Sequence, residues 1–244
     1  MVYKKRYDGR KFDEMRPIKM EVGVLDNANG SAVFQIGNTK VIAGVYGPKI
    51  LHPQRLRKKN KGVVRVHYRM MPFSVSERKN PRPGRRDIEL SKVIKESLES
   101  AIFLEQFGDA VIDIHVYVVQ GDAGTRCACV SAASLALADA GIPMNDLVGS
   151  VAAGSVGEQV LLDLTYDEEH VEGEDVTDMA IAYNENLDSV TLLQMDGNIS
   201  EKNMVKALDV GIKGCKMIKK EMQKALKKRY EWKWHLKKIL KNEL

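Results

Sequence analysis

The sequence predicts an α+β fold, in which helices pack on mixed β-sheets. Segments with strand patterns and segments with helical spacing alternate as strands, helix, strand and helix, followed by strands and helix again. No linker rich in Pro, Gly or Ser separates the two rounds, and 244 residues are enough for one substantial core. We therefore expect one domain over residues 1–244, with halves of about 1–145 and 146–225 and a basic tail at 226–244.

The first half opens with strands. Residues 31–47 contain two apolar runs joined at Gly37-Asn38, a pairing that is typical of a β-hairpin. Apolar and polar side chains then alternate through residues 62–73, as expected of a half-buried strand.

The next strand is predicted between two helices in the sequence. The spacing of apolar residues predicts a helix over 87–106, with Asp87 as its N-cap. A strand at 110–120 follows. A second helix is expected from near Thr125 to Gly141, and its Ala, Ser and Leu content indicates burial on more than one side.

The second half repeats the theme with two hairpins and one long helix. The hairpins are expected at 151–165, turning at 157–158, and at 178–197, turning near 186–188, and the helix from Ser200 or Glu201 to about Tyr230.

The composition is that of a soluble globular protein, with 44% hydrophobic and 29% charged residues. No apolar run approaches the roughly 20 residues needed to span a bilayer, and no apolar stretch follows the basic N-terminus. Neither a membrane anchor nor a signal peptide is expected. Cys127, Cys129 and Cys215 form no C-x-x-C pair, so we expect a reduced, cytoplasmic protein without disulfides or structural zinc.

Basic residues are concentrated in two places, although the net charge is only +5. No carboxylate occurs from Lys49 to Ser76, and a second basic run closes the chain, where Trp232 and Trp234 stand among lysines. A charge run is usually a solvated face. The loop at 49–62 is equally consistent with an electrostatic guide for a polyanion.

One candidate anion site lies between the strand at 110–120 and the following helix. Backbone N–H groups at a helix start attract anions, and Gly124 allows close approach. Thr125 and Arg126 would add a hydroxyl and a guanidinium group. A simple strand–helix turn is the alternative.

The stretch 172–178 carries four carboxylates just before an apolar strand. Although an acidic surface loop would explain most of them, Asp178 directly abuts the strand. A carboxylate there can act as a general acid or hold a divalent metal.

Arg85 and Arg86 stand just before the start of the predicted helix, where the helix dipole disfavours cations by about 0.3–1 kcal/mol each. They are either exposed turn residues or ligands of a phosphate that would remove this cost. Arginines, an anion loop and a carboxylate together suit phosphoryl transfer on a nucleic acid.

Four separated motifs then identify a family. They are "RYDGRKFDEMRPIKMEVGVLDNANGSAVFQIGNTKVIAGVYGP", "MMPFSVSERKNPRPGRRDIELSKVIKESLE", "GDAGTRCACVSAASLALADAGIPM" and "DMAIAYNENLDSVTLLQMDGNIS". From about residue 5 to about residue 225 the chain resembles the RNase PH family, and within it the catalytic subunit of the archaeal exosome.

The resemblance implies a single RNase PH-like domain built on a duplicated fold like the second domain of ribosomal protein S5. It also implies 3′→5′ phosphorolysis of RNA, in which inorganic phosphate is the co-substrate and nucleoside diphosphates are released, with 3′ tailing as the reverse reaction.

The site residues that the resemblance implies fall into three groups. Inorganic phosphate would lie at Gly124, Thr125 and Arg126. Asp178 would be the general acid, a Mg²⁺ ligand, or both. The RNA-binding residues would be Arg85, Arg86 and Arg65.

The chain departs from the family pattern at the second acidic residue, which usually precedes the "DM" aspartate by five or six positions. Glu172 has this spacing, whereas the "ED" pair at Glu174-Asp175 lies closer. Asp175 and Glu172 are therefore the alternatives for the second catalytic acid.

The resemblance further implies a hexameric ring of three heterodimers, formed with an inactive paralogous subunit and capped by RNA-binding subunits. The loop at 55–61 would then grip RNA in the channel. The alternatives are a non-catalytic RNA-binding ring subunit and a stand-alone RNase PH that trims tRNA 3′ ends.

Overall fold

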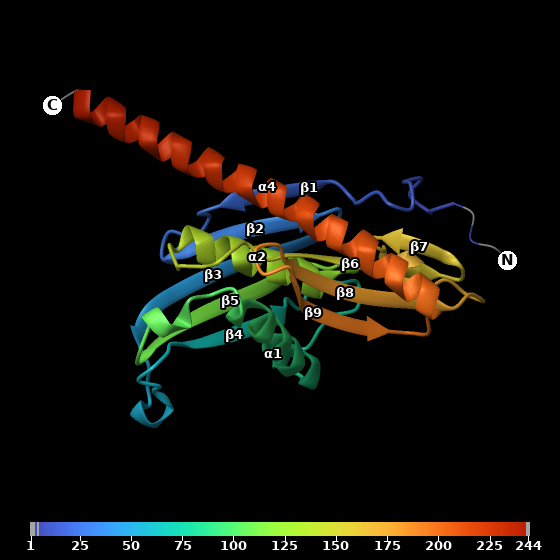
Figure 1. Ribbon diagram of the computed structural model, residues 1–244, viewed down its shortest axis with the longest axis horizontal. Coiled ribbons are helices and arrows are strands. Elements are labelled where there is room, and N and C mark those ends of the chain that lie inside the picture. Colours follow the sequence, from blue (N-terminus) through green and yellow to red (C-terminus); the bar gives the residue numbers. More distant parts are fainter. Residues whose placement is uncertain (1–2, 4, 243–244) are drawn as a thin grey trace.

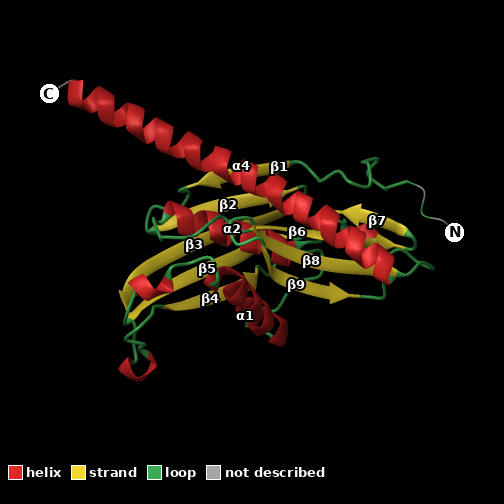
Figure 2. Cartoon of the chain, viewed as in Figure 1, coloured by secondary structure: helices red, strands yellow, loops and turns green. Residues whose placement is uncertain are grey.

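The computed structural model describes residue 3 and residues 5–242, with side chains as far as residue 231. Its strands form two sheets, and helices pack on both, as Figures 1 and 2 show. This is the α+β architecture that the sequence predicts. The elements are β1 (Ile18–Val22), β2 (Gly30–Ile36), β3 (Thr39–Ile50), η1 (Gln54–Leu56), β4 (Val63–Met70), α1 (Arg85–Glu99), η2 (Leu104–Gln106), β5 (Ala110–Gln120), α2 (Thr125–Asp139), β6 (Gly149–Val156), β7 (Gln159–Leu162), α3 (Tyr166–Glu169), β8 (Val176–Asn184), β9 (Ser189–Asp196) and α4 (Glu201–Asn242).

The first sheet has the strand order β1-β2-β3-β5-β4. The β2–β3 hairpin turns at Gly37, whose φ of 54° is one that glycine adopts at little cost. The β4–β5 pair is parallel and the other pairs are antiparallel, so the sheet is mixed. Because β4 and β5 run in the same direction, both end near the start of α2.

The second sheet has the order β7-β6-β8-β9, and all its pairs are antiparallel. Both predicted hairpins are confirmed. The first turns at Gly157, which has a φ of 56°. The second turns between Asn184 and Ser189.

Helix α2 lies at the centre of the molecule, against β2 and β3 of one sheet and β6 of the other. Its residues from Cys127 to Leu137 are all buried, as its small side chains predict. Helix α4 covers the opposite face of the second sheet and also reaches β1. The largest apolar core contains residues from both sheets, so α2 is packed between them.

The expected start and end of α1 were wrong. The helix begins at Arg85, and its N-cap is Gly84 instead of Asp87. Asp87 is the third helical residue, and its Oδ2 accepts a hydrogen bond from the N–H of Gly84 at 2.7 Å. The helix ends at Glu99 because the following chain is engaged elsewhere: Ile102 pairs with Met144 in an isolated β-bridge.

The C-terminal segment is helical where the sequence predicted a tail. Helix α4 continues to Asn242, and Figure 1 shows its end projecting beyond both sheets. No Gly or Pro interrupts the sequence after Gly214, which favours continuation of the helix. Arg229 fastens it to the body through Asp139 at 2.7 Å. The side chains of Trp232 and Trp234 lie outside the described residues.

The basic segment at 49–62 contains the end of β3 and the short helix η1, and its lysine and arginine side chains are largely exposed. Among the described residues, no helix is long and apolar enough to cross a membrane.

Candidate active site

A strained loop precedes α2. We call residues 121–124 the anion loop. Ala123 and Gly124 both have positive φ, 57° and 61°, and this conformation is costly for a residue with a side chain. Gly124 is the N-cap of α2, so Thr125 and Arg126 occupy its first turn. The residues of the predicted anion site therefore lie at the N-terminus of a buried helix, and their binding of an anion stays a prediction.

Arg126 faces a carboxylate from the other half of the chain. Its Nη2 lies 2.8 Å from Oδ2 of Asp178, on β8. Its Nη1 donates to Oε1 of Gln194, on β9, at 2.7 Å. Gln194 in turn donates to Glu89 of α1 at 2.9 Å. This chain of contacts joins α2, β8, β9 and α1 around one site.

Asp178 is a largely buried carboxylate with spare bonding capacity. Only 14% of its side chain is exposed, and Oδ1 has no hydrogen-bond partner within the described part of the chain. Burial raises the pKa of Asp178 above its ordinary value and the charge of Asp196 adds to this, while Arg126 and Arg86 act in the opposite direction. A carboxyl group that holds its proton more tightly than usual is suited to general acid catalysis.

The backbone beside Asp178 is tightly packed. Asp178 pairs with Gly154 of β6, and a Cβ at Gly154 would lie 1.8 Å from the carbonyl oxygen of Thr177. Only a residue without a side chain permits this approach of β6 to β8. Gly154 thus fixes the position of the strand that carries Asp178.

Arg85 and Arg86 lie in the first turn of α1, and both are exposed. Within the described residues neither makes an ion pair. The charge of Arg86 contributes to the pKa of Asp178, which places α1 at the same site. Asp87 supplies the acidic residue that a helix N-terminus favours, so the two guanidinium groups are left for another partner.

Within the described residues, the two sequence candidates for the second acid make no side-chain hydrogen bond or ion pair with Arg126 or Asp178. Glu172 and Asp175 are both exposed. Asp175 lines a separate cavity of about 860 Å³ near the β6–β7 turn, together with residues such as Gly157 and Asn203. The structure therefore does not bring these candidates together with Arg126.

Glu169, at the end of α3, is a site residue that the sequence reasoning missed. Burial and then the charge of Asp178 raise its pKa to about 7, while Arg126 and His170 lower it. Glu169 therefore shares the electrostatic environment of Asp178. The pattern T-x-x-E at Thr165–Glu168 is a capping box, and it could have located α3 in the sequence.

Arg65 lies apart from this group. It is on β4, on the outer face of the first sheet, where its Nε and Nη2 contact the carboxylate of Asp113 at 2.6 and 3.0 Å. Met70, at the end of β4, lies beside Gly121 of the anion loop. Five residues of strand separate Arg65 from Met70, which is about 16 Å. The structure thus does not bring Arg65 to Arg126 and Asp178.

The described residues contain no cluster of three or more His, Cys, Asp or Glu side chains that could hold a metal ion. Asp178 and Glu169 provide two carboxylates, and the unpartnered Oδ1 of Asp178 is a free oxygen ligand. Mg²⁺ is commonly held by one or two carboxylates, with waters and substrate phosphates completing its shell. The site fits an ion that substrate helps to bind.

Comparisons with known proteins identify the family to which the chain belongs. Residues 14–143 match the first domain of the 3′ exoribonuclease family, and residues 146–214 match the second. The chain is 51% identical to exosome complex component Rrp41 of Pyrococcus abyssi, over 93% of this chain and 90% of the relative. It is 48% identical to exosome complex component Rrp41 of Nitrosopumilus maritimus, over 93% of this chain and 91% of the relative.

Solved structures show the same fold. Rice Rrp46 superposes with a TM-score of 0.77 at 25% identity, covering 89% of this chain and 98% of that chain. A chain from the Archaeoglobus fulgidus exosome with RNA bound to the active site superposes with a TM-score of 0.76 at 26% identity, covering 89% and 92%. The motifs, the fold and the matched residues lead to one conclusion: the chain belongs to the 3′ exoribonuclease family, RNase PH type.

Proposed function

We propose that this protein is the catalytic subunit of an archaeal-type exosome and degrades RNA from its 3′ end by phosphorolysis. The observation that carries the proposal is the contact between Arg126 and the buried Asp178 at 2.8 Å, beside the N-terminus of α2. A guanidinium group, free N–H groups and a protonatable carboxyl are thereby placed at one point. The relatives named exosome complex component Rrp41 support the same assignment.

Positive charge is supplied from two helices. Inorganic phosphate would bind at the anion loop, with Thr125 and Arg126 as side-chain donors. Arg85 and Arg86, from the first turn of α1, would hold the phosphates of the RNA 3′ end. Two anions must approach each other in this reaction, and cations on both sides reduce their repulsion.

Asp178 would act as the general acid. An oxygen of inorganic phosphate attacks the last phosphorus atom of the RNA, and the bond from this phosphorus to the 3′ oxygen breaks. The leaving 3′ oxygen takes the proton of the Asp178 carboxyl, and a nucleoside diphosphate departs. The raised pKa of Asp178 keeps that proton available nearer to neutral pH than for an ordinary aspartate.

Asp178 and Glu169 would hold Mg²⁺ if the reaction uses one, because both contribute to one electrostatic site. A bound Mg²⁺ would neutralise charge on the reacting phosphates. The residues of the chain would still bind and orient the two anions.

We further propose that the chain works in a hexameric ring with a paralogous inactive subunit, capped by RNA-binding subunits, in the cytoplasm. Apolar side chains are exposed on elements that adjoin the site: Ile88 of α1 is 66% exposed, and Leu193 of β9 is 47% exposed. Exposed apolar side chains of this kind are common where a partner packs. The basic loop at 55–61 would contact the RNA backbone.

The proposal is tested by incubating the assembled complex with a labelled RNA, with and without inorganic phosphate. Nucleoside diphosphates should appear only when phosphate is present. Release of nucleoside monophosphates would show a hydrolytic enzyme. Activity that survives unchanged in an Asp178→Asn complex would show a non-catalytic ring subunit.

A further inference from the structure

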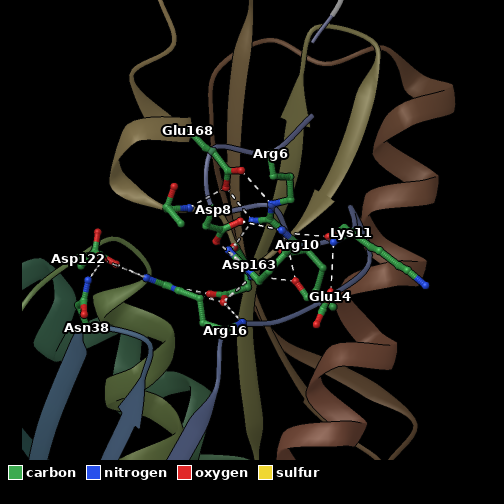
Figure 3. Close-up of polar contacts among 12 residues, drawn as sticks. Arg6, Asp8, Arg10, Lys11, Glu14, Arg16, Asn38, Asp122, Asp163 and Glu168 are labelled. Atoms are coloured by element: carbon green, nitrogen blue, oxygen red, sulfur yellow. Dashed lines mark hydrogen bonds and ion pairs between the residues drawn. The ribbon is translucent and has the colours of Figure 1, made fainter. Parts of the chain in front are cut away.

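The N-terminal segment, residues 5–17, lies beside β7, the edge strand of the second sheet, and three arginines hold it there, as Figure 3 shows. Arg6 binds the buried carboxylate of Glu168 through Nη2 at 2.6 Å, and Arg10 reaches Asp163 at 3.3 Å. Arg16 completes the group. Only Arg16 extends beyond this network to the candidate active site.

Asp163 fixes one side of Arg16. Its Oδ2 accepts from the backbone N–H of Arg16 at 2.8 Å and from Nε at 2.9 Å, and its Oδ1 accepts from Nη2 at 2.7 Å. Both side chains are almost completely buried, with 6% and 2% exposed. Burial lowers the pKa of Arg16, but the hydrogen bonds and charge of Asp163 more than offset this, so the guanidinium stays charged and immobile.

The remaining guanidinium nitrogen of Arg16 holds the anion loop. Nη1 donates to the carbonyl oxygen of Asp122 at 2.5 Å. Arg16 also lies close to Gly124: a Cβ atom added to Gly124 would be 3.6 Å from Nη2 of Arg16. Figure 3 shows the guanidinium extended between Asp163 and Asp122.

Thr39, at the start of β3, holds the loop from a second side. Its hydroxyl lies 2.8 Å from the carbonyl oxygens of both Asp122 and Ala123, and it accepts from the N–H of Asp122 at 2.9 Å. The side chain is fully buried. Two independent groups thus contact the carbonyl oxygen of Asp122, and Thr39 also reaches the carbonyl oxygen of Ala123.

These contacts determine where the N–H groups of the loop point. In a trans peptide the C=O and the following N–H are directed oppositely. When the carbonyl groups of Asp122 and Ala123 are held against Arg16 and Thr39, the N–H groups of Ala123 and Gly124 point away from them. Within the described residues, these two N–H groups have no hydrogen-bond acceptor.

The conformation would not persist without such contacts. A left-handed backbone costs a residue with a side chain roughly 1–2 kcal/mol, and Ala123 has a φ of 57°. Strain of this kind is maintained only where surrounding groups fix the backbone.

We propose that Arg16 is a positioning residue that, together with Thr39, holds the anion loop so that the N–H groups of Ala123 and Gly124 face inorganic phosphate. Arg16 acts through the loop without touching the anion, because Asp163 and Asp122 occupy its donors. This inference rests on the proposed phosphorolytic function, and it adds a role for the N-terminal segment in that reaction.

The test is steady-state kinetics of nucleoside diphosphate release by the full chain in the assembly that it forms. Arg16→Met should raise the KM for inorganic phosphate about tenfold or more, and change kcat and the KM for RNA less than about threefold. Arg16→Lys keeps the positive charge but loses the planar set of guanidinium donors that contacts Asp163 and Asp122 together. Its KM for phosphate should therefore lie between the values of the wild type and of Arg16→Met. Thr39→Val, which removes the second holding group, should raise the same constant.

Arg229→Met is the matched control. Arg229 also pairs with a buried carboxylate, Asp139 at 2.7 Å, and donates to a backbone oxygen, Val22 at 2.9 Å, but it lies far from the loop. It should lower Tm and leave the KM for phosphate unchanged.

The outcomes separate the two hypotheses. A phosphate-dependent wild type whose Arg16→Met variant keeps its KM for phosphate, or loses RNA affinity to the same extent, overturns the positioning role alone. If Arg16→Met does not fold, Thr39→Val decides, and an unchanged KM for phosphate in that variant overturns the role. A wild type that releases only monophosphates contradicts the proposed function and this inference together.

Discussion

At the scale of single residues, the proposed chemistry depends most directly on the carboxyl of Asp178. Its burial, its contact with Arg126 and its unpartnered Oδ1 describe a group that can hold or release a proton beside bound anions. These properties lead to distinct expectations for activity and for stability.

Replacing Asp178 by Asn should reduce the rate of phosphorolysis by about 10²–10⁴-fold, because the Asn side-chain amide cannot protonate the leaving oxygen. RNA affinity should change little, since the arginines remain. Single-turnover release of nucleoside diphosphate and fluorescence anisotropy of bound RNA measure the two effects. Asp209→Asn, at an exposed carboxylate on α4, is the control and should retain activity. Near-normal turnover by Asp178→Asn would remove this residue from the mechanism.

Glu169 makes a prediction about pH. Its pKa is about 7 in the folded chain, against 4.5 for an ordinary glutamate. A raised carboxyl pKa means that folding favours the protonated form, so stability is lost as the pH rises between these values. Glu169→Gln removes that loss. In metal-free buffer its Tm should exceed the wild-type value by about 2–4 °C at pH 8 and match it near pH 4.5.

Differential scanning calorimetry at both pH values measures this difference. The exposed Glu172→Gln is the control and should show no such dependence. A gain in Tm that is equal at both pH values would contradict the raised pKa of Glu169.

The sequence identified Asp178 and Arg126 but could not place them together, because 52 residues separate them and their contact depends on the packing of α2 against β8. The resemblance to a family supplied their roles. The family pattern places the second acidic residue five or six positions before Asp178, whereas Glu169 lies nine positions before it because the loop is longer here. The pattern therefore did not indicate Glu169. The structure replaces that rule with a physical criterion, which is that burial and the charge of Asp178 raise the pKa of Glu169.

At the scale of elements, helix α1 determines how RNA would reach the site. Its first turn carries Arg85 and Arg86, while Asp87 satisfies the N-cap backbone. The arginines therefore contribute nothing to capping, and they work against the helix dipole. Their expected use is in binding.

The double variant Arg85→Ala/Arg86→Ala should bind RNA more weakly, and the slope of log K against log salt should shrink by about 1.4, or 0.7 for each lost phosphate contact with a single strand. Tm should be unchanged or slightly higher, because two cations leave a positive helix end. Salt titrations by anisotropy and thermal melts check both parts.

Lys92→Ala/Lys95→Ala is the matched control on the same helix. These lysines pair with Glu96 and Glu99 at 3.8 and 3.5 Å, one turn further on. The control should leave the salt slope unchanged. A double arginine variant that melts early but degrades RNA normally would assign the arginines to folding instead.

Element positions were predictable where local chemistry decides them. Gly37 and Gly157 mark tight turns, and both hairpins lie where the sequence indicated. The ends of α1 and α4 were not predictable in this way. The first depends on the tertiary pairing of Ile102 with Met144. The second follows from a sequence without Gly or Pro after Gly214, which favours a helix beyond the expected end near Tyr230.

At the scale of the whole molecule, the site is assembled from both sheets and from α1, α2 and α3. Arg85 and Arg86 are on the surface, and apolar side chains are exposed on α1 and β9 beside the site. A partner that covers these apolar side chains would also enclose the site. Binding of such a partner is therefore expected to change the RNA-degrading activity of the chain as well as the mass of the complex.

The chain expressed alone should show little phosphorolysis, and activity should appear when the paralogous subunit is added. Native mass spectrometry and an RNA degradation assay on the same samples test this. A stable and active hexamer of this chain alone would favour the stand-alone RNase PH alternative.

The close packing at Gly154 limits which residues this position can carry. Any side chain there would meet the carbonyl of Thr177 at 1.8 Å and displace the strand beside Asp178. Substitution at position 154 is therefore not tolerated, because even the methyl group of alanine would clash with the carbonyl oxygen of Thr177. In a saturation library selected for RNA turnover, glycine should be the sole survivor at position 154, although this residue offers no functional group to the reaction.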